Sequence, residues 1–168
     1  MSLTTGVHST AQGAFVKAFS IWQDKQRSHL RSTADKSIKG AMAIEVQWSE
    51  TRAKLKADAK FWLDESKGDV SVVITVSISS NGKISIERWN LSQQSGDPFP
   101  TQTMAIERLP DGPRITGEMK VNFCDIFLRD KQAAESDFEI SHDNLIEMAD
   151  DVWLELDLWN AARRGSTP

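Results

Sequence analysis

Residues 41–91 read AMAIEVQWSETRAKLKADAKFWLDESKGDVSVVITVSISSNGKISIERWNL, and this stretch decides the fold. A short apolar run at 41–48 is followed by helical spacing at 50–65 and by two alternating segments at 69–80 and 83–91. Short apolar runs are typical of buried strands, and alternation at period two is typical of strands with one buried face. The order strand, helix, hairpin predicts an α/β (α+β) protein with a mixed central β-sheet.

The two alternating segments are joined by Asn81-Gly82. Because these residue types accept positive φ at both central positions, the dipeptide predicts a two-residue hairpin turn. A second hairpin is expected from 101–108 and 115–128, turned by the Pro-Asp-Gly-Pro sequence at 110–113.

Three helices are expected around this sheet. The N-terminal one, at 11–31, carries aromatic residues at spacings of four and three: Phe15, Phe19 and Trp22. The helix at 50–65 is expected to be capped by Ser49, and a long C-terminal helix at 143–163 by Ser141.

Length and composition favour one globular domain over residues 1–168, with flexible termini at 1–10 and 164–168. The single cysteine, Cys124, cannot form an intrachain disulfide. No signal-peptide pattern opens the sequence, and its apolar runs fall far short of the roughly 20 residues of a membrane span. We therefore expect an intracellular protein, cytoplasmic or nuclear, with no membrane partner.

The charges are unevenly distributed around a net value of −4. Residues 11–39 hold six basic and two acidic side chains, whereas 125–157 hold eleven acidic and two basic ones. A local basic face can meet phosphate although the total charge is acidic, so nucleic acid is a candidate partner for the basic region at 17–60. The alternative is that these are two solvated surfaces of different charge.

Leu154 and Leu158 fall on the acidic face of the C-terminal helix, opposite its apolar face. Burying a leucine fully is worth about 1.5–3 kcal/mol. We expect both to contact a protein partner, a second subunit or an outer loop of the same chain.

Glu45 is the most informative polar residue because it interrupts an apolar strand. A carboxylate in such a position is costly unless it is paired, bound to metal or at a wet edge. Strand alternation places Ala43, Glu45 and Gln47 on one face, and Asp35 is the nearest aspartate upstream.

At these residues the chain resembles the PD-(D/E)XK restriction-endonuclease-like superfamily. It is most similar to fungal and bacterial members in which an E-V-x-x-S strand end leads into a helix with an aromatic-Leu pair. The matching residues at the strand end are Glu45, Val46 and Ser49; those of the helix are Leu55, Asp58, Ala59, Trp62 and Leu63; those of the later strand are Ile86, Glu87, Arg88 and Trp89.

This resemblance implies a metal-dependent nuclease acting on nucleic-acid phosphodiesters, whether active or catalytically degenerate. Glu45 and Asp35 would hold Mg²⁺ or Mn²⁺ through oxygen. Gln47 stands where the Glu-x-Lys motif has its lysine. The lysine of the bacterial relatives lies in the following helix, which makes Lys54 the candidate, with Lys56 behind it.

Each of these residues also has a structural interpretation. Glu45 can pair with a lysine at a sheet edge, Lys54 can lie on a solvated helix face, and Asp35 can be an ordinary loop residue. Gln47 is either a substitute ligand or a neutral replacement. The rival hypothesis is a non-catalytic protein-interaction module on a nuclease-like fold, and the placement of Asp35, Glu45 and Lys54 in one cleft would favour the enzyme.

Overall fold

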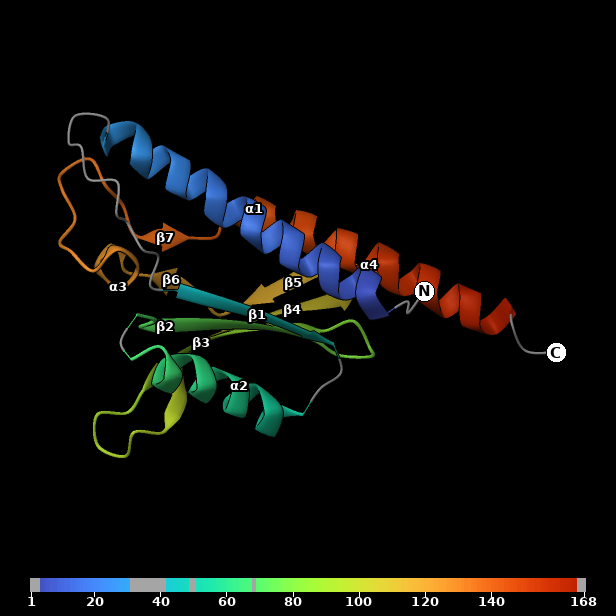
Figure 1. The fold of residues 1–168 in the computed structure, drawn as a ribbon. Helices are drawn as coiled ribbons and strands as arrows, with labels where there is room; N and C mark the ends of the chain where they lie inside the picture. Colours follow the sequence, from blue (N-terminus) through green and yellow to red (C-terminus); the bar gives the residue numbers. More distant parts are fainter. Residues whose placement is uncertain (1–3, 31–41, 49–50, 68, 166–168) are drawn as a thin grey trace.

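The computed structural model describes residues 4–30, 42–48, 51–67 and 69–165. Within them the chain is an α+β fold, as predicted, with helices on both faces of a mixed sheet (Figure 1). The elements are α1 (Thr4–Leu30), β1 (Met42–Trp48), α2 (Arg52–Glu65), β2 (Val72–Ile78), β3 (Ile84–Leu91), β4 (Pro98–Leu109), β5 (Gly112–Thr116), β6 (Lys120–Val121), α3 (Phe123–Phe127), β7 (Phe138–Glu139) and α4 (His142–Gly165).

The main sheet has the order β1-β2-β3-β4-β5. Strand β1 pairs in parallel with β2, and each later neighbour pairs antiparallel. A parallel pair requires a crossover connection, which α2 supplies. Strands β6 and β7 form a separate two-stranded sheet.

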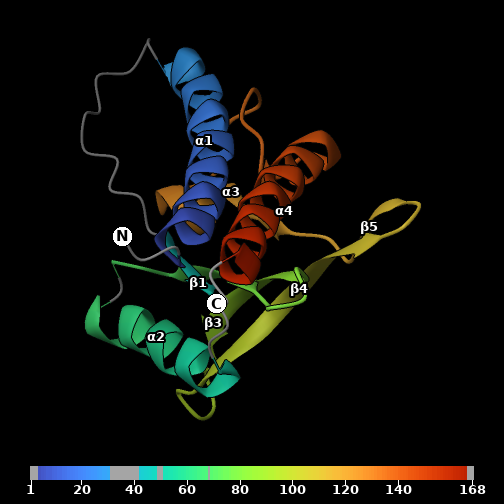
Figure 2. The ribbon, with the colours of Figure 1, turned by 90° about the vertical axis from the view of Figure 1, so that its right-hand side faces the viewer.

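Helices α1 and α4 lie side by side on one face of the sheet, and α2 covers the other face (Figures 1 and 2). The larger core lies under α1 and α4, where alternate residues of β2, beginning at Val72 and ending at Ile78, are fully buried. The smaller core lies under α2 and contains Leu55, Ala59, Leu63, Val73 and Trp89. The helical spacing of its three α2 residues explains why that helix lies flat on the sheet.

The first hairpin forms as expected, but the prediction of a two-residue turn is wrong. Ser79 pairs with Lys83, so the loop has three residues, and the Gly82 amide donates to the Ser79 carbonyl. Only Gly82 has positive φ in this turn, at +84°. A turn followed by a left-handed glycine is the usual three-residue loop, and the Asn81 side chain stabilises it by accepting from the Lys83 amide.

The second hairpin is shorter than predicted. Strand β5 ends at Thr116, and the remainder of the expected strand at 115–128 forms β6 and the short helix α3. The spacing of the buried residues Phe123, Ile126 and Phe127 suits a helical turn, because three apolar side chains then point to one side.

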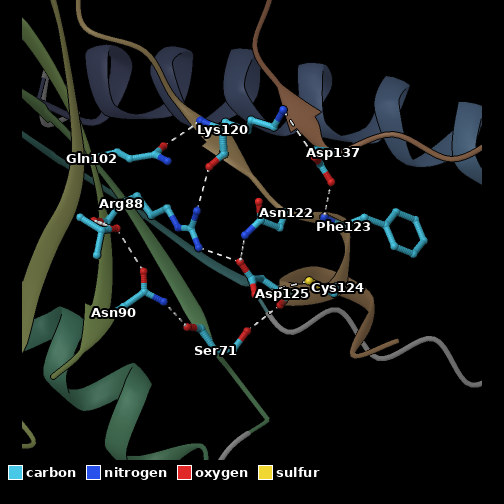
Figure 3. Close-up of polar contacts among 11 residues, drawn as sticks. Ser71, Arg88, Asn90, Gln102, Lys120, Asn122, Phe123, Cys124, Asp125 and Asp137 are labelled. Atoms are coloured by element: carbon cyan, nitrogen blue, oxygen red, sulfur yellow. Dashed lines mark hydrogen bonds and ion pairs between the residues drawn. The ribbon is translucent and has the colours of Figure 1, made fainter. Parts of the chain in front are cut away.

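Buried Arg88 holds this segment against the sheet (Figure 3). Its guanidinium donates to the Lys120 carbonyl at 2.9 Å and to the Asp125 carboxylate at 2.7 Å. Ser71 donates to the backbone carbonyl of Asp125, and Asn90 donates to the Ser71 carbonyl. The network thus links α3 to the start of β2 and to the last residues of β3.

Two helix starts differ from the predictions. Helix α1 already begins at Thr4, so residues 4–10 are helical and Val7 is buried. Helix α2 begins at Arg52, and its cap is Thr51, whose hydroxyl accepts from the Lys54 amide; the predicted cap Ser49 lies outside the described residues. The predicted cap of α4 is confirmed, since the Ser141 hydroxyl accepts from the Asn144 amide.

Among the described residues, no helix is both long and apolar enough to cross a membrane.

Candidate functional site

Four elements meet at one end of the molecule. Strand β1 points toward the end where α1 and α2 begin and where α4 finishes (Figure 1). In the view onto this end, α1 and α4 lie side by side above the sheet, and α2 lies below it (Figure 2). Within the described residues β1 is one of the two edge strands of this sheet, so its outer side pairs with no other strand.

The alternation of β1 is as predicted. Ile44, Val46 and Trp48 pack on the larger core, whereas Ala43 packs on the smaller core under α2. Glu45 and Gln47 share the face of Ala43, so both side chains are directed toward α2.

A cavity of about 610 Å³ lies between the end of β1 and the first turns of α2. It brings together three of the four predicted site residues, namely Glu45, Gln47 and Lys54. The other lining residues are His8, Val46, Trp48, Asp58, Phe61 and Trp62. Asp35, the fourth predicted residue, lies outside the described residues.

Glu45 is half-buried and is oriented by a tryptophan of α2. The indole N–H of Trp62 donates to Glu45 Oε1, across the cavity. A carboxylate has two oxygens, so this bond leaves Oε2 for a further ligand or donor. The expected pairing of Glu45 with a lysine is replaced by this neutral donor.

Gln47 is only 6% exposed. One of the two polar atoms of its amide makes a hydrogen bond and the other makes none. Its Nε2 donates to the Asp58 carboxylate, while Oε1 has no hydrogen-bond partner among the described residues. A buried acceptor without a donor costs about 1–3 kcal/mol. This oxygen is itself shielded from solvent, so it would reach a cation or a donor group only if the Gln47 side chain turned toward the cavity.

Lys54 stands in the first turn of α2 with an exposed side chain. Because Lys54, Asp58 and Trp62 are spaced four residues apart, they form one stripe along α2, facing the cavity. Lys56, the second candidate lysine, is exposed and is not among the lining residues.

The cavity contains two polar residues that the sequence did not single out as site residues. Asp58 could have been predicted from the sequence, because it lies four residues from both Lys54 and Trp62 and therefore on the same helix face. His8 comes from α1, far away in the sequence, and no local pattern indicates it.

The oxygen donors of the cavity fit a hard cation. Glu45 and Asp58 supply carboxylates, and Gln47 supplies the orphaned amide oxygen. No cluster of three or more His, Cys, Asp or Glu side chains able to hold a metal occurs in the described part of the chain. Mg²⁺ is commonly bound through one or two carboxylates with waters completing its octahedron, so Glu45 and Asp58 are the residues that would hold it.

The basic region at 17–60 is partly neutralised within the fold. Lys17 on α1 pairs with Glu147 on α4 at 3.0 Å, and Arg52 pairs with buried Glu87 at 3.0 Å. Part of the predicted charge asymmetry is therefore balanced within the fold, by the ion pair between Lys17 on α1 and Glu147 on α4. Lys54 lines the cavity.

Leu154 and Leu158 are 59% and 57% exposed on α4. No segment of the described chain covers them, so the predicted contact with an outer loop of the same chain does not form among the described residues. Leu154 also lines a groove of about 310 Å³ between α4 and the turn after β4.

Comparison with protein-family models, curated proteins and solved structures gives no match for this chain. The resemblance to PD-(D/E)XK proteins stays a prediction from the motif residues.

Proposed function

We propose that this chain is a metal-dependent nuclease-like protein that acts on nucleic-acid phosphodiesters inside the cell. The observation that carries the proposal is the convergence of Glu45, Gln47, Asp58 and Lys54 on one cavity at the end of β1. Glu45 and Gln47 contribute oxygens from β1, and Asp58 and Lys54 contribute a carboxylate and an ammonium group from α2; metal-dependent phosphodiester hydrolysis uses groups of these kinds.

The residues of the chain have separable roles in this proposal. Glu45, Asp58 and the Gln47 amide oxygen would hold Mg²⁺ or Mn²⁺. The Trp62 indole fixes the Glu45 carboxylate, which lowers the entropy lost on binding a ligand. Lys54 binds a non-bridging phosphate oxygen and stabilises the charge that develops there. His8 supplies an imidazole that can accept a proton from water or return one to the leaving group.

The bound cation would supply Lewis acidity and a water of lowered pKa. Gln47 cannot supply the positive charge of the Glu-x-Lys motif, so that charge comes from Lys54, one element later in the chain.

The decisive experiment measures Mg²⁺- and Mn²⁺-dependent cleavage of single- and double-stranded DNA and RNA. Wild type is expected to cleave, and Glu45→Gln to lose cleavage while keeping its fold. Lys54→Ala is expected to be slower on the order of 10²–10³-fold, as for the loss of one transition-state charge contact. Asp111→Asn and Lys56→Ala are matched controls, since both residues are exposed and neither lines the cavity.

Mn²⁺ binding by calorimetry completes the test. Absence of both cleavage and Mn²⁺ binding in the wild type would reject the proposal. Equal cleavage by wild type and Glu45→Gln would assign the activity to another site or to a contaminant.

A non-catalytic protein-interaction role is the second candidate, and the exposed leucines of α4 favour it. Leu154 and Leu158 are one turn apart and rimmed by acidic residues, including Asp151 and Asp157. An amphipathic face of this kind suits association with a second subunit through α4.

Sedimentation of wild type and a Leu154→Gln/Leu158→Gln variant tests this second role. A concentration-dependent dimer in the wild type that the variant lacks would support it. A wild type that stays monomeric at high concentration would remove the homodimer.

A further inference from the structure

We infer that the proposed site takes a single-stranded nucleic acid, with unpaired bases on its aromatic side chains and phosphates on Lys54 and Arg163. The inference rests on the proposed function and specifies its substrate class. It comes from aromatic and cationic side chains that continue outward from the cavity on both sides.

On the α2 side, two adjacent aromatic residues form the rim of the cavity. Phe61 is 58% exposed and Trp62 is 37% exposed, and their rings meet edge to face with centroids 5.8 Å apart. Large aromatic rings left in water are unfavourable, and both of these line the cavity that holds Glu45 and Lys54. An edge-to-face pair leaves ring faces available for a stacked base.

On the α4 side, a second aromatic series ends in a cation. Trp48 lines the cavity and contacts Trp159 edge to face at 6.1 Å, and the Arg163 guanidinium lies 4.6 Å from the Trp159 ring centroid. These residues come from the end of β1 and the last turns of α4, which share one end of the molecule (Figures 1 and 2).

The resulting surface alternates between groups that bind phosphates and groups that bind bases. From α4 to α2 it presents Arg163, Trp159 and Trp48, then the polar cavity with Lys54, then Phe61. Basic groups with interleaved aromatic rings are the usual means of binding single strands, because every base has a face that can stack.

A duplex cannot make the same stacking contacts with this surface. Its bases are stacked on one another and offer only their edges in the grooves. The exposed ring of Phe61 would then stay in water instead of stacking on a base, so the structure favours a strand whose bases are already unstacked.

Binding is measured by fluorescence anisotropy with a thymidine oligonucleotide and with a duplex, in EDTA so that no turnover occurs. Wild type is expected to prefer the single strand. Phe61→Ala should weaken single-strand binding by about 5- to 100-fold, the range for loss of one stacked base, without changing its salt dependence. Phe99→Ala is the matched control, because Phe99 is exposed but does not line the cavity.

Arg163→Ala has a different signature. Removing one phosphate contact should reduce the slope of log affinity against log salt by about 0.7 for a single strand. Arg114→Ala is its control, since it removes the same charge from β5 at the opposite edge of the sheet.

The inference is overturned if duplex and single strand bind equally, or if Phe61→Ala behaves like Phe99→Ala. Its failure is distinguishable from failure of the proposed function. Cleavage of duplex without preference for single strands rejects the inference alone, whereas single-strand binding without any cleavage rejects only the hydrolytic activity.

Discussion

The indole N–H of Trp62 donates to a carboxylate oxygen of Glu45, joining the last turn of α2 to the edge strand β1. Trp62→Phe keeps an aromatic ring but removes this donor. We expect Mn²⁺ affinity to fall by about 10- to 100-fold, as it does when an outer partner of a metal ligand is lost. Calorimetry measures this change, and the urea midpoint should stay that of the wild type. An unchanged Mn²⁺ affinity would show that Glu45 does not depend on Trp62 for its position.

Mutation of Gln47 to lysine would place the lysine of the Glu-x-Lys motif at its usual position on β1. Gln47 lies two residues from Glu45 on the same strand face, and its side chain already reaches Asp58. We expect Gln47→Lys to restore part of the cleavage lost in Lys54→Ala, because the new ammonium group would enter the same cavity while one proposed oxygen ligand is lost. The comparison is made between the double variant and Lys54→Ala alone. A double variant no faster than Lys54→Ala would mean that the position of the charge on α2 is essential.

The turn after β2 is held by α4. The Trp153 indole donates to the Gly82 carbonyl at 2.7 Å, and a Cβ added to Gly82 would lie 3.3 Å from both Trp153 and Leu156. Gly96 also has positive φ, but open space surrounds it. Gly96→Ala should therefore cost only the left-handed backbone, about 1 kcal/mol, and Gly82→Ala a further 1–3 kcal/mol or so from overpacking. Urea unfolding measures both, and equal losses would contradict the packing argument.

Asp137 couples the stability of α3 to pH. Its carboxylate accepts from the Phe123 amide at 3.0 Å, and this bond, together with Lys131 and Lys120, lowers the pKa of Asp137. A carboxyl group with a lower pKa in the folded state stabilises the fold above its unfolded pKa of about 3.9. That stability is lost as the pH falls through the lower, folded value.

Asp137→Asn is thus expected to be less stable than the wild type at neutral pH, by about 1–2 kcal/mol. The gap should close progressively below about pH 4, where the wild-type carboxylate becomes protonated. Thermal unfolding of both proteins across this range is the measurement. A gap that is constant with pH would assign the loss to altered packing.

Patterns within β1, α2 and the first hairpin were sufficient to predict those elements. Their apolar residues repeat at period two or at helical spacing, and the buried positions in α2 follow the helical period. Strand β2 is buried on both faces, because α2 covers the face opposite α1 and α4. The start of α1 was missed because Gly6 and the Ser and Thr residues around it are weak helix formers. Burial of Val7, Ala11 and Phe15 at a spacing of four overrides this propensity.

The candidate site was predicted only as far as β1 and the first turn of α2. Lys54 could be found from its charge and position after the strand, but the bond from Trp62 to Glu45 depends on how α2 lies on the sheet. His8 enters through the packing of α1, which no local pattern records. Short segments such as α3 fail for another reason, because a few apolar residues suit a strand and a helical turn equally.

The parallel pairing of β1 also determines when the cavity forms during folding. Strands β2 to β5 follow one another as antiparallel neighbours, whereas β1 joins β2 only after the connection through α2 has closed. The antiparallel strands therefore assemble first, and the cavity wall carrying Glu45 and Gln47 is added to them. In hydrogen exchange, we expect the β1 amides to lose protection before those of β3, so that the site opens before the centre of the sheet.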